Sequence, residues 1–201
     1  KNMENEGVAA EACFAIRSLC GVDAVRVQLL NLWSPAPDAV LIALKTHVKS
    51  EAIVGEAFRA IISFHSKADD SVMVRLFSPP STKRFIKHDL ASQGVAHSTL
   101  KAMRKSRKSE FVTKWGLHLL CLISENDNLK TQLLSLTDVL DGVAVALQEV
   151  AYSEGVAEYA CRLIYNLGQV EGVTSKMRRV GWCETVVATL QRHSMSVKVL
   201  E

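Results

Sequence analysis

Four stretches of this chain repeat one pattern of apolar and polar positions. Each starts at a β-branched residue, has a small residue at its fifth position, and has apolar residues at its ninth and twelfth positions. The stretches start at Val8, Ile53, Val112 and Val156, and a further copy starts at Val197. Apolar residues at this spacing lie on one face of a helix, so the pattern predicts four long helices. Recurrence at roughly 40–47 residues is typical of a helical repeat array.

A glycine directly before an apolar residue is a second landmark. These glycines are Gly94, Gly142 and Gly181. Glycine can adopt positive φ and admits close backbone approach, so we expect a tight junction between helices there. Each unit is then predicted to hold a short helix, a glycine corner, a middle helix and a longer third helix. Within residues 126–169 the expected helices are 128–135, 137–150 and 153–168.

The small and apolar positions match a known repeat family. The fifth positions hold Ala12, Ala57, Gly116 and Ala160, and the ninth and twelfth hold Ile16 and Leu19, Ile61 and Phe64, Leu120 and Ile123, Ile164 and Leu167. In these positions the chain resembles the armadillo family. The resemblance implies an all-α fold, a right-handed α-solenoid of armadillo-like three-helix repeats. HEAT repeats, which have two helices in each unit, are the alternative. The sequence departs from the armadillo pattern at residues 35–38, where prolines stand in place of the expected glycine.

The resemblance also implies one armadillo-like array over residues 1–201. Residues 1–20 would be the third helix of a partial repeat, and residues 170–201 would be a truncated repeat. The fuller repeats would be 21–65, 66–125 with an insertion near 76–90, and 126–169. Because the pattern starts and stops within a repeat, we expect the chain to be a fragment of a longer protein.

In armadillo-like arrays the third helices line a concave groove, and this sets the expected binding residues. The outward positions would form three ladders: Glu11, Glu56, Trp115 and Tyr159; Phe14, Arg59, His118 and Arg162; Ser18, Ser63, Leu122 and Asn166. We expect a protein partner, an acidic or mixed peptide or helix, to bind Phe14, Arg59, Trp115, His118, Tyr159, Arg162 and Asn166. Import receptors of this fold pair tryptophan with asparagine; only Asn166 fits, so binding of basic import cargo is not expected. The alternative is that the aromatics pack on adjacent repeats and the arginines are solvated.

Charge is uneven along the chain, although the net charge is only +3. Between Lys83 and Lys114 there are nine basic residues and two acidic ones. The basic patch is predicted at Lys83, Arg84, Lys101, Arg104, Lys105, Arg107 and Lys108. It suits association with nucleic acid, an anionic membrane or an acidic protein, or a role as a localisation signal. The alternative is a solvated corner, since basic residues also complement a helix C-terminus.

Cysteine usage and motifs bear on compartment and catalysis. The five cysteines show no CxxC spacing, which favours a reducing compartment, the cytoplasm or the nucleus. His118 and Cys121 lie three residues apart and could form a ligand pair or an activated thiol, but a place in the core or in the groove is the better interpretation. No phosphate-binding loop and no hydrolase motif occurs. We therefore expect a non-catalytic interaction scaffold with no catalytic residues, metal or cofactor, or else a structural spacer within a larger multidomain protein.

Overall fold

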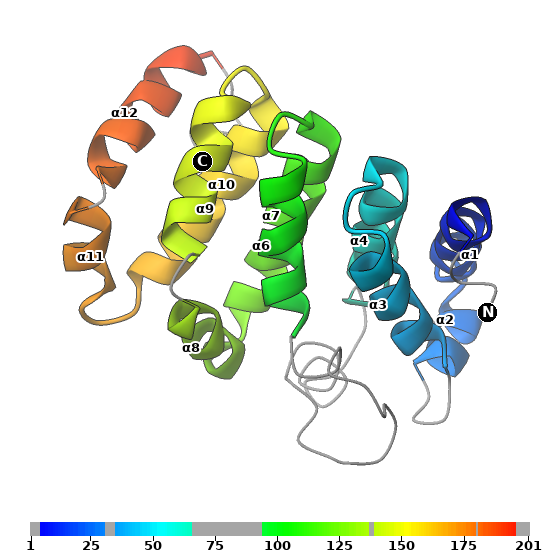
Figure 1. The fold of residues 1–201 in the computed structure, drawn as a ribbon. Coiled ribbons are helices and arrows are strands. Elements are labelled where there is room, and N and C mark those ends of the chain that lie inside the picture. Colours follow the sequence, from blue (N-terminus) through cyan, green and yellow to red (C-terminus); the bar gives the residue numbers. More distant parts are fainter. Residues whose placement is uncertain (1–4, 31–34, 66–93, 137–138, 180, 196–201) are drawn as a thin grey trace. The chain divides into compact units, whose positions relative to one another are not determined.

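The chain folds into helices throughout the part that the structure describes. The computed structural model describes residues 5–30, 35–65, 94–136, 139–179 and 181–195, which form eleven helices and no strand (Figure 1). The predicted all-α fold is confirmed. The chain divides into two compact units, residues 1–102 and 103–201, and the division falls within one helix, α6.

The first unit is organised around α4. Its helices are α1 (Glu6–Leu19), α2 (Asp23–Leu29), α3 (Ala36–Thr46) and α4 (Glu51–His65), and α4 packs against both α1 and α3. Phe58, Ile61 and Phe64 on α4 are fully buried, as the repeat pattern predicts for Ile61 and Phe64. Pro37 lies in the first turn of α3, where a missing N–H costs no helical hydrogen bond. A proline-containing start thus replaces the glycine corner expected before this helix.

The second unit is organised around two long, adjacent helices. Its helices are α7 (Glu110–Glu125), α8 (Asp127–Ser135), α9 (Val139–Glu149), α10 (Glu154–Gly168), α11 (Val173–Arg179) and α12 (Trp182–Arg192), after the end of α6 (Val95–Lys105). α7 and α10 pack along each other, and α9 packs against α10 and α12. The Ser109 and Ser153 hydroxyls accept hydrogen bonds from the Val112 and Val156 N–H groups, and so cap α7 and α10.

The helix bounds can be compared with those expected. In residues 126–169, α8 and α10 begin and end within one residue of prediction, and α9 ends one residue early. The corner expected at Gly142 is not observed, because Gly142 lies inside the helix α9. The corner at Gly181 is present, with φ +76° before α12. Gly172, not singled out in the sequence, has φ +79° and allows the turn between α10 and α11.

The small residue at the fifth position does what the repeat pattern requires. Ala57 and Ala160 are completely buried, Gly116 is buried, and only Ala12 on α1 is partly exposed. A larger side chain at these positions would hold neighbouring helices apart, so close helix packing depends on them. The predicted insertion near 76–90 and the basic residues Lys83 and Arg84 lie outside the described residues. No helix in the described part has the length and apolar character needed to cross a membrane.

Candidate functional site

Three aromatic rings on α7 and α10 form a continuous stack. The ring centroids of Trp115 and His118 are 5.9 Å apart with an interplanar angle of 29°. Those of His118 and Tyr159 are 4.2 Å apart and nearly parallel, at 9°. Trp115 and His118 lie one turn apart on α7, whereas Tyr159 comes from α10. All three are partly exposed, and we call them the aromatic surface. The structure therefore brings three predicted groove residues together.

Hydrogen bonds beside this surface join the same two helices. The Cys121 thiol donates to the Tyr159 carbonyl oxygen at 3.0 Å. The Asn166 amide donates to the Ser124 hydroxyl oxygen at 2.9 Å, and that hydroxyl donates to the Cys121 carbonyl at 2.6 Å. Asn166, predicted to bind a partner, thus uses its amide nitrogen within the protein. These bonds hold α10 on α7 and fix the position of the Tyr159 backbone.

The environment of Cys121 opposes thiolate chemistry. Burial raises the pKa of Cys121 to about 12; Arg162 lowers it, while Glu125 and Glu158 raise it further. The thiol stays protonated at neutral pH and acts as a hydrogen-bond donor. A nucleophilic cysteine needs the opposite shift. His118, one turn before Cys121 on α7, stacks between the Trp115 and Tyr159 rings.

Two cations border the aromatic surface. Arg162 is exposed on α10, and its charge acts on both Cys121 and Tyr159. The Lys114 ammonium lies 5.6 Å from the centroid of the Trp115 ring, within the range of a cation–π interaction. The Lys114 chain also passes over Gly155, where an added Cβ would come within 2.8 Å of Lys114 Cε. The sequence predicted Arg162 here; Lys114 was missed as a neighbour of the aromatic surface.

The corresponding face of the first unit carries charges. Glu56 on α4 accepts hydrogen bonds from two arginines, Arg17 Nε of α1 at 2.9 Å and an Arg59 terminal nitrogen at 2.8 Å. The Arg17 guanidinium also lies 4.8 Å from the centroid of the Phe14 ring, which is 48% exposed. We call Phe14, Arg17, Glu56 and Arg59 the charged surface. A partner carboxylate would have to compete with Glu56 for Arg59. Sequence reasoning placed Glu56 outward but missed Arg17 as its partner.

The predicted groove residues therefore fall into two sets, one in each unit. Phe14 and Arg59 belong to the charged surface of the first unit. Trp115, His118, Tyr159 and Arg162 gather at the aromatic surface of the second, with Asn166 close by on α10. A single groove that joins the two sets stays a prediction.

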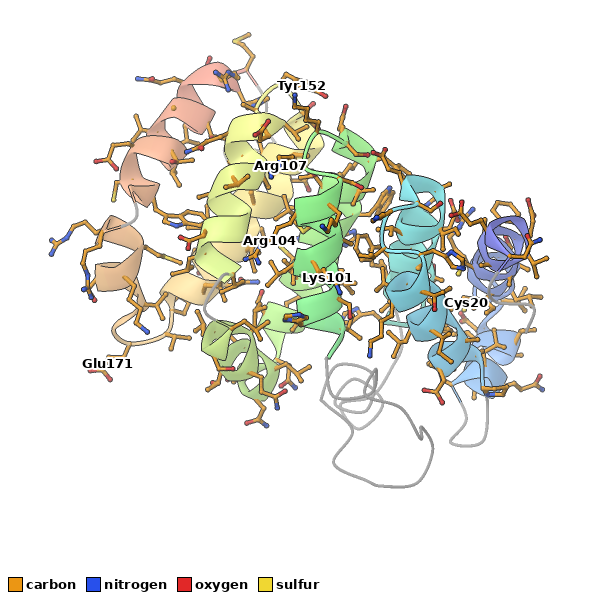
Figure 2. The ribbon with its side chains drawn as sticks, viewed as in Figure 1. Cys20, Lys101, Arg104, Arg107, Tyr152 and Glu171 are labelled. Atoms are coloured by element: carbon orange, nitrogen blue, oxygen red, sulfur yellow. The ribbon has the colours of Figure 1, made fainter. Side chains whose placement is uncertain are left out.

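The basic patch is exposed where the structure describes it. Lys101, Arg104, Lys105, Arg107 and Lys108 are all solvent-exposed, and Figure 2 shows Lys101, Arg104 and Arg107 in succession along α6 and the turn after it. A cavity of about 230 Å³ lies beside this turn. It is lined by Met103, Arg104, Arg107, Thr113, Asp141, Gly142, Val145 and Ala146. The sequence identified the arginines, but not the α9 residues that complete the cavity.

Comparison with known proteins adds no relative: no family model matches the chain, and neither a curated protein nor a solved structure shows significant similarity to it. The armadillo resemblance therefore rests on the residues themselves. In the described part of the chain, no group of three or more histidine, cysteine or acidic side chains is placed to hold a metal ion.

Proposed function

We propose that this chain is a non-catalytic protein-interaction scaffold, an armadillo-like right-handed solenoid that binds a peptide or helix on its third-helix face. The observation that carries the proposal is the aromatic surface, a partly exposed stack of Trp115, His118 and Tyr159 across two neighbouring helices. Tryptophan, tyrosine and arginine supply most of the energetically dominant contacts in protein interfaces. Stacked rings also lose little conformational entropy on binding, because their positions are already fixed.

The chemistry of the border suggests the character of the partner. Arg162 is exposed at one side of the stack, and a guanidinium pairs well with a carboxylate in two parallel hydrogen bonds. The ring faces favour an apolar or aromatic side chain. We therefore propose a partner segment with an acidic residue close to an apolar one. The five free thiols, three of them buried, fit a cytoplasmic or nuclear setting.

The test starts from peptides selected with the whole chain as bait from a random-peptide phage library. Their affinities are then measured by fluorescence anisotropy against variants. Trp115→Ala and Tyr159→Ala should each weaken binding about tenfold or more, and Arg162→Glu should do so without loss of packing, since its side chain is exposed. Tyr165→Ala is the matched control on the same helix, because Tyr165 is 69% exposed and outside the stack. Equal losses for Tyr165 and Tyr159 would refute the proposal.

The basic patch supports a second candidate function, association with nucleic acid or an anionic membrane. The observation in its favour is the exposure of all five described cations at one helix end. Such binding falls steeply with salt, because counterions are released from the polyanion. This function is tested by titrating the chain with duplex DNA and with phosphatidylserine vesicles over a range of salt concentrations. An affinity that does not change with salt excludes it. If neither polyanions nor selected peptides bind, the structural-spacer hypothesis remains.

A further inference from the structure

The cavity beside the basic patch is built from three helices of the second unit. Met103 and Arg104 come from the end of α6, and Arg107 from the turn that follows. Buried Thr113 comes from α7, and α9 contributes Asp141, Gly142, Val145 and Ala146. The apolar residues Met103, Val145 and Ala146 line the cavity together with the charged residues Arg104, Arg107 and Asp141. Apolar residues combined with a few polar or charged ones are typical of a recognition pocket.

The size of the cavity limits what it can hold. Its volume of about 230 Å³ is below the roughly 300–1,000 Å³ of pockets that enclose drug-sized ligands or cofactors. One amino-acid side chain fits a space of this size better than a whole cofactor does. Gly142 contributes to the space because it has no side chain, although glycine is among the poorest residues inside a helix. The cavity is thus suited to a single apolar side chain of a larger partner.

The charges around the cavity favour one chemical class of partner. Arg104 and Arg107 line it, and the exposed Lys101, Lys105 and Lys108 extend the positive charge. Asp141, however, lines the same cavity from the α9 side. A phosphodiester backbone presents only acceptors and negative charge, which Asp141 would repel. A peptide backbone supplies N–H donors for a carboxylate, and its acidic side chains pair with the arginines.

We propose that this cavity is a docking pocket for an acidic peptide, with one apolar side chain inserted between α6 and α9 and a neighbouring carboxylate on the exposed Arg107. Asp141 accepts hydrogen bonds from the peptide backbone at the rim. The site is separate from the aromatic surface on α7 and α10. It therefore does not depend on the function proposed above for that surface.

The experiment varies the apolar side chain at constant charge. Fluorescein-labelled peptides of sequence Glu-Glu-X-Glu-Glu, with X as Ala, Val, Leu or Phe, are titrated with the whole chain and followed by anisotropy. Affinity should rise about tenfold from X = Ala to X = Leu, because more apolar surface enters the cavity. A purely electrostatic patch would bind all four peptides equally. Duplex DNA and phosphatidylserine vesicles are titrated in parallel at the same salt concentration.

Two variants test the pocket from different sides. Gly142→Leu fills the cavity, leaves every charge unchanged and improves helix propensity, and it should abolish the preference for X = Leu over X = Ala. Arg107→Gln should weaken all four peptides about threefold or more through lost pairing. Lys176→Gln is the control for net charge, since Lys176 is exposed on α11 and does not line the cavity; it should leave the peptide affinities unchanged.

The outcomes are distinguishable. The pocket is supported if the peptide affinity depends on the residue X and the Gly142→Leu variant removes that dependence. The proposal is overturned if the affinity is independent of X or if no peptide binds. It is also overturned if DNA or vesicles bind more tightly than the peptides and lose affinity equally in the Arg107→Gln variant. Circular dichroism of each variant confirms that the helices are retained, and Arg107→Gln, at an exposed turn position, keeps the test valid if Gly142→Leu disturbs folding.

Discussion

Two pairs of neighbouring long helices, α1–α4 and α7–α10, carry the same repeat positions with different chemistry. In the first pair Glu56, at a fourth position, joins Arg17 and Arg59 through charged hydrogen bonds. In the second pair Tyr159, at the same repeat position, stacks on His118, and neutral hydrogen bonds from Cys121 and Asn166 complete the contact. Ion pairs between side chains thus join the first helix pair at its surface, whereas stacked aromatic rings join the second.

The comparison separates what a repeat fixes from what it leaves variable. In both pairs the residue at the fourth repeat position of the later helix contacts the residue at the seventh or tenth repeat position of the earlier helix. This offset between the contacting positions follows from the packing of the two helices and not from the side chains that meet. The surface chemistry can therefore change from one unit to the next while the backbone arrangement within each pair is kept. Each helix pair can present a different binding surface.

The largest expected effects test whether both pairs depend equally on their buried side chains. Phe64 and Leu167 occupy the twelfth positions of α4 and α10, and both are completely buried. Phe64→Ala and Leu167→Ala should each lower the free energy of unfolding by about 2–5 kcal/mol, because each leaves a cavity. Urea denaturation followed by circular dichroism measures the loss. A loss well below 1 kcal/mol in either variant would show that polar contacts hold that pair.

Alkaline pH should weaken both pairs through their buried thiols. Burial raises the pKa of Cys13 to about 11, with Glu56 adding to the shift, and that of Cys121 to about 12, both from a usual 9.0. Above pH 9 the unfolded chain releases these protons while the folded chain keeps them. The contribution of each buried thiol to the free energy of unfolding is thus fully present below pH 9 and is lost as the pH rises toward 11 or 12.

The loss should reach on the order of 1–3 kcal/mol by pH 11. Other groups titrate in this range, so the difference between the parent chain and Cys13→Ala or Cys121→Ala is the quantity to measure, from urea midpoints between pH 8 and 11. That difference should shrink with rising pH. A difference independent of pH would mean that the thiols are accessible to solvent in the folded chain.

Salt should distinguish the two surfaces. Glu56→Ala removes the shared partner of Arg17 and Arg59, and we expect a loss of about 1–2 kcal/mol at low ionic strength. Screening should reduce this loss at about 0.5 M salt. Tyr159→Ala should also lower the free energy of unfolding, and salt should not change the size of that loss. Glu11→Ala is the control at the same repeat position on α1, where the side chain is exposed and a change within about 0.5 kcal/mol is expected.

The smallest effects concern the eleventh positions. The Ser18 hydroxyl donates to the Phe14 carbonyl within its own helix, at 2.9 Å, whereas Asn166 reaches the neighbouring helix. Asn166→Ala should therefore cost about 0.5–1.5 kcal/mol, and Ser18→Ala only a few tenths. Thermal unfolding of the two variants measured side by side resolves the difference. Equal losses would contradict a bridging role for Asn166.

Local features of the fold could be predicted from the sequence because they depend on neighbouring residues. The 3.6-residue period placed α8 and α10 within one residue of their observed bounds. The prediction of a corner at Gly142 was wrong, because the sequence around a glycine does not show whether it lies in a helix or at a turn. In the structure Gly142 lies inside α9 and lines the cavity beside Arg107.

Contacts between helices could be predicted only in part. Trp115 and Tyr159 were assigned to one ladder and His118 to another, whereas the structure stacks all three. The reason is the offset between α7 and α10, which places the seventh position of one helix opposite the fourth of the next. In the first unit the fourth position, Glu56, meets the tenth position of the earlier helix, Arg17. A single sequence carries no measure of this offset, so the residues were identifiable as outward-facing but their partners were not.

The close approach of Lys114 to Gly155 has a consequence for how this protein can evolve. Any side chain at position 155 would push the flexible end of Lys114 aside, and with it the positive charge over Trp115. A substitution at a position that itself carries no binding group would thus alter the aromatic surface. Among homologous chains we expect residues 114 and 155 to change together. Lineages that lose the glycine should shorten or replace the lysine.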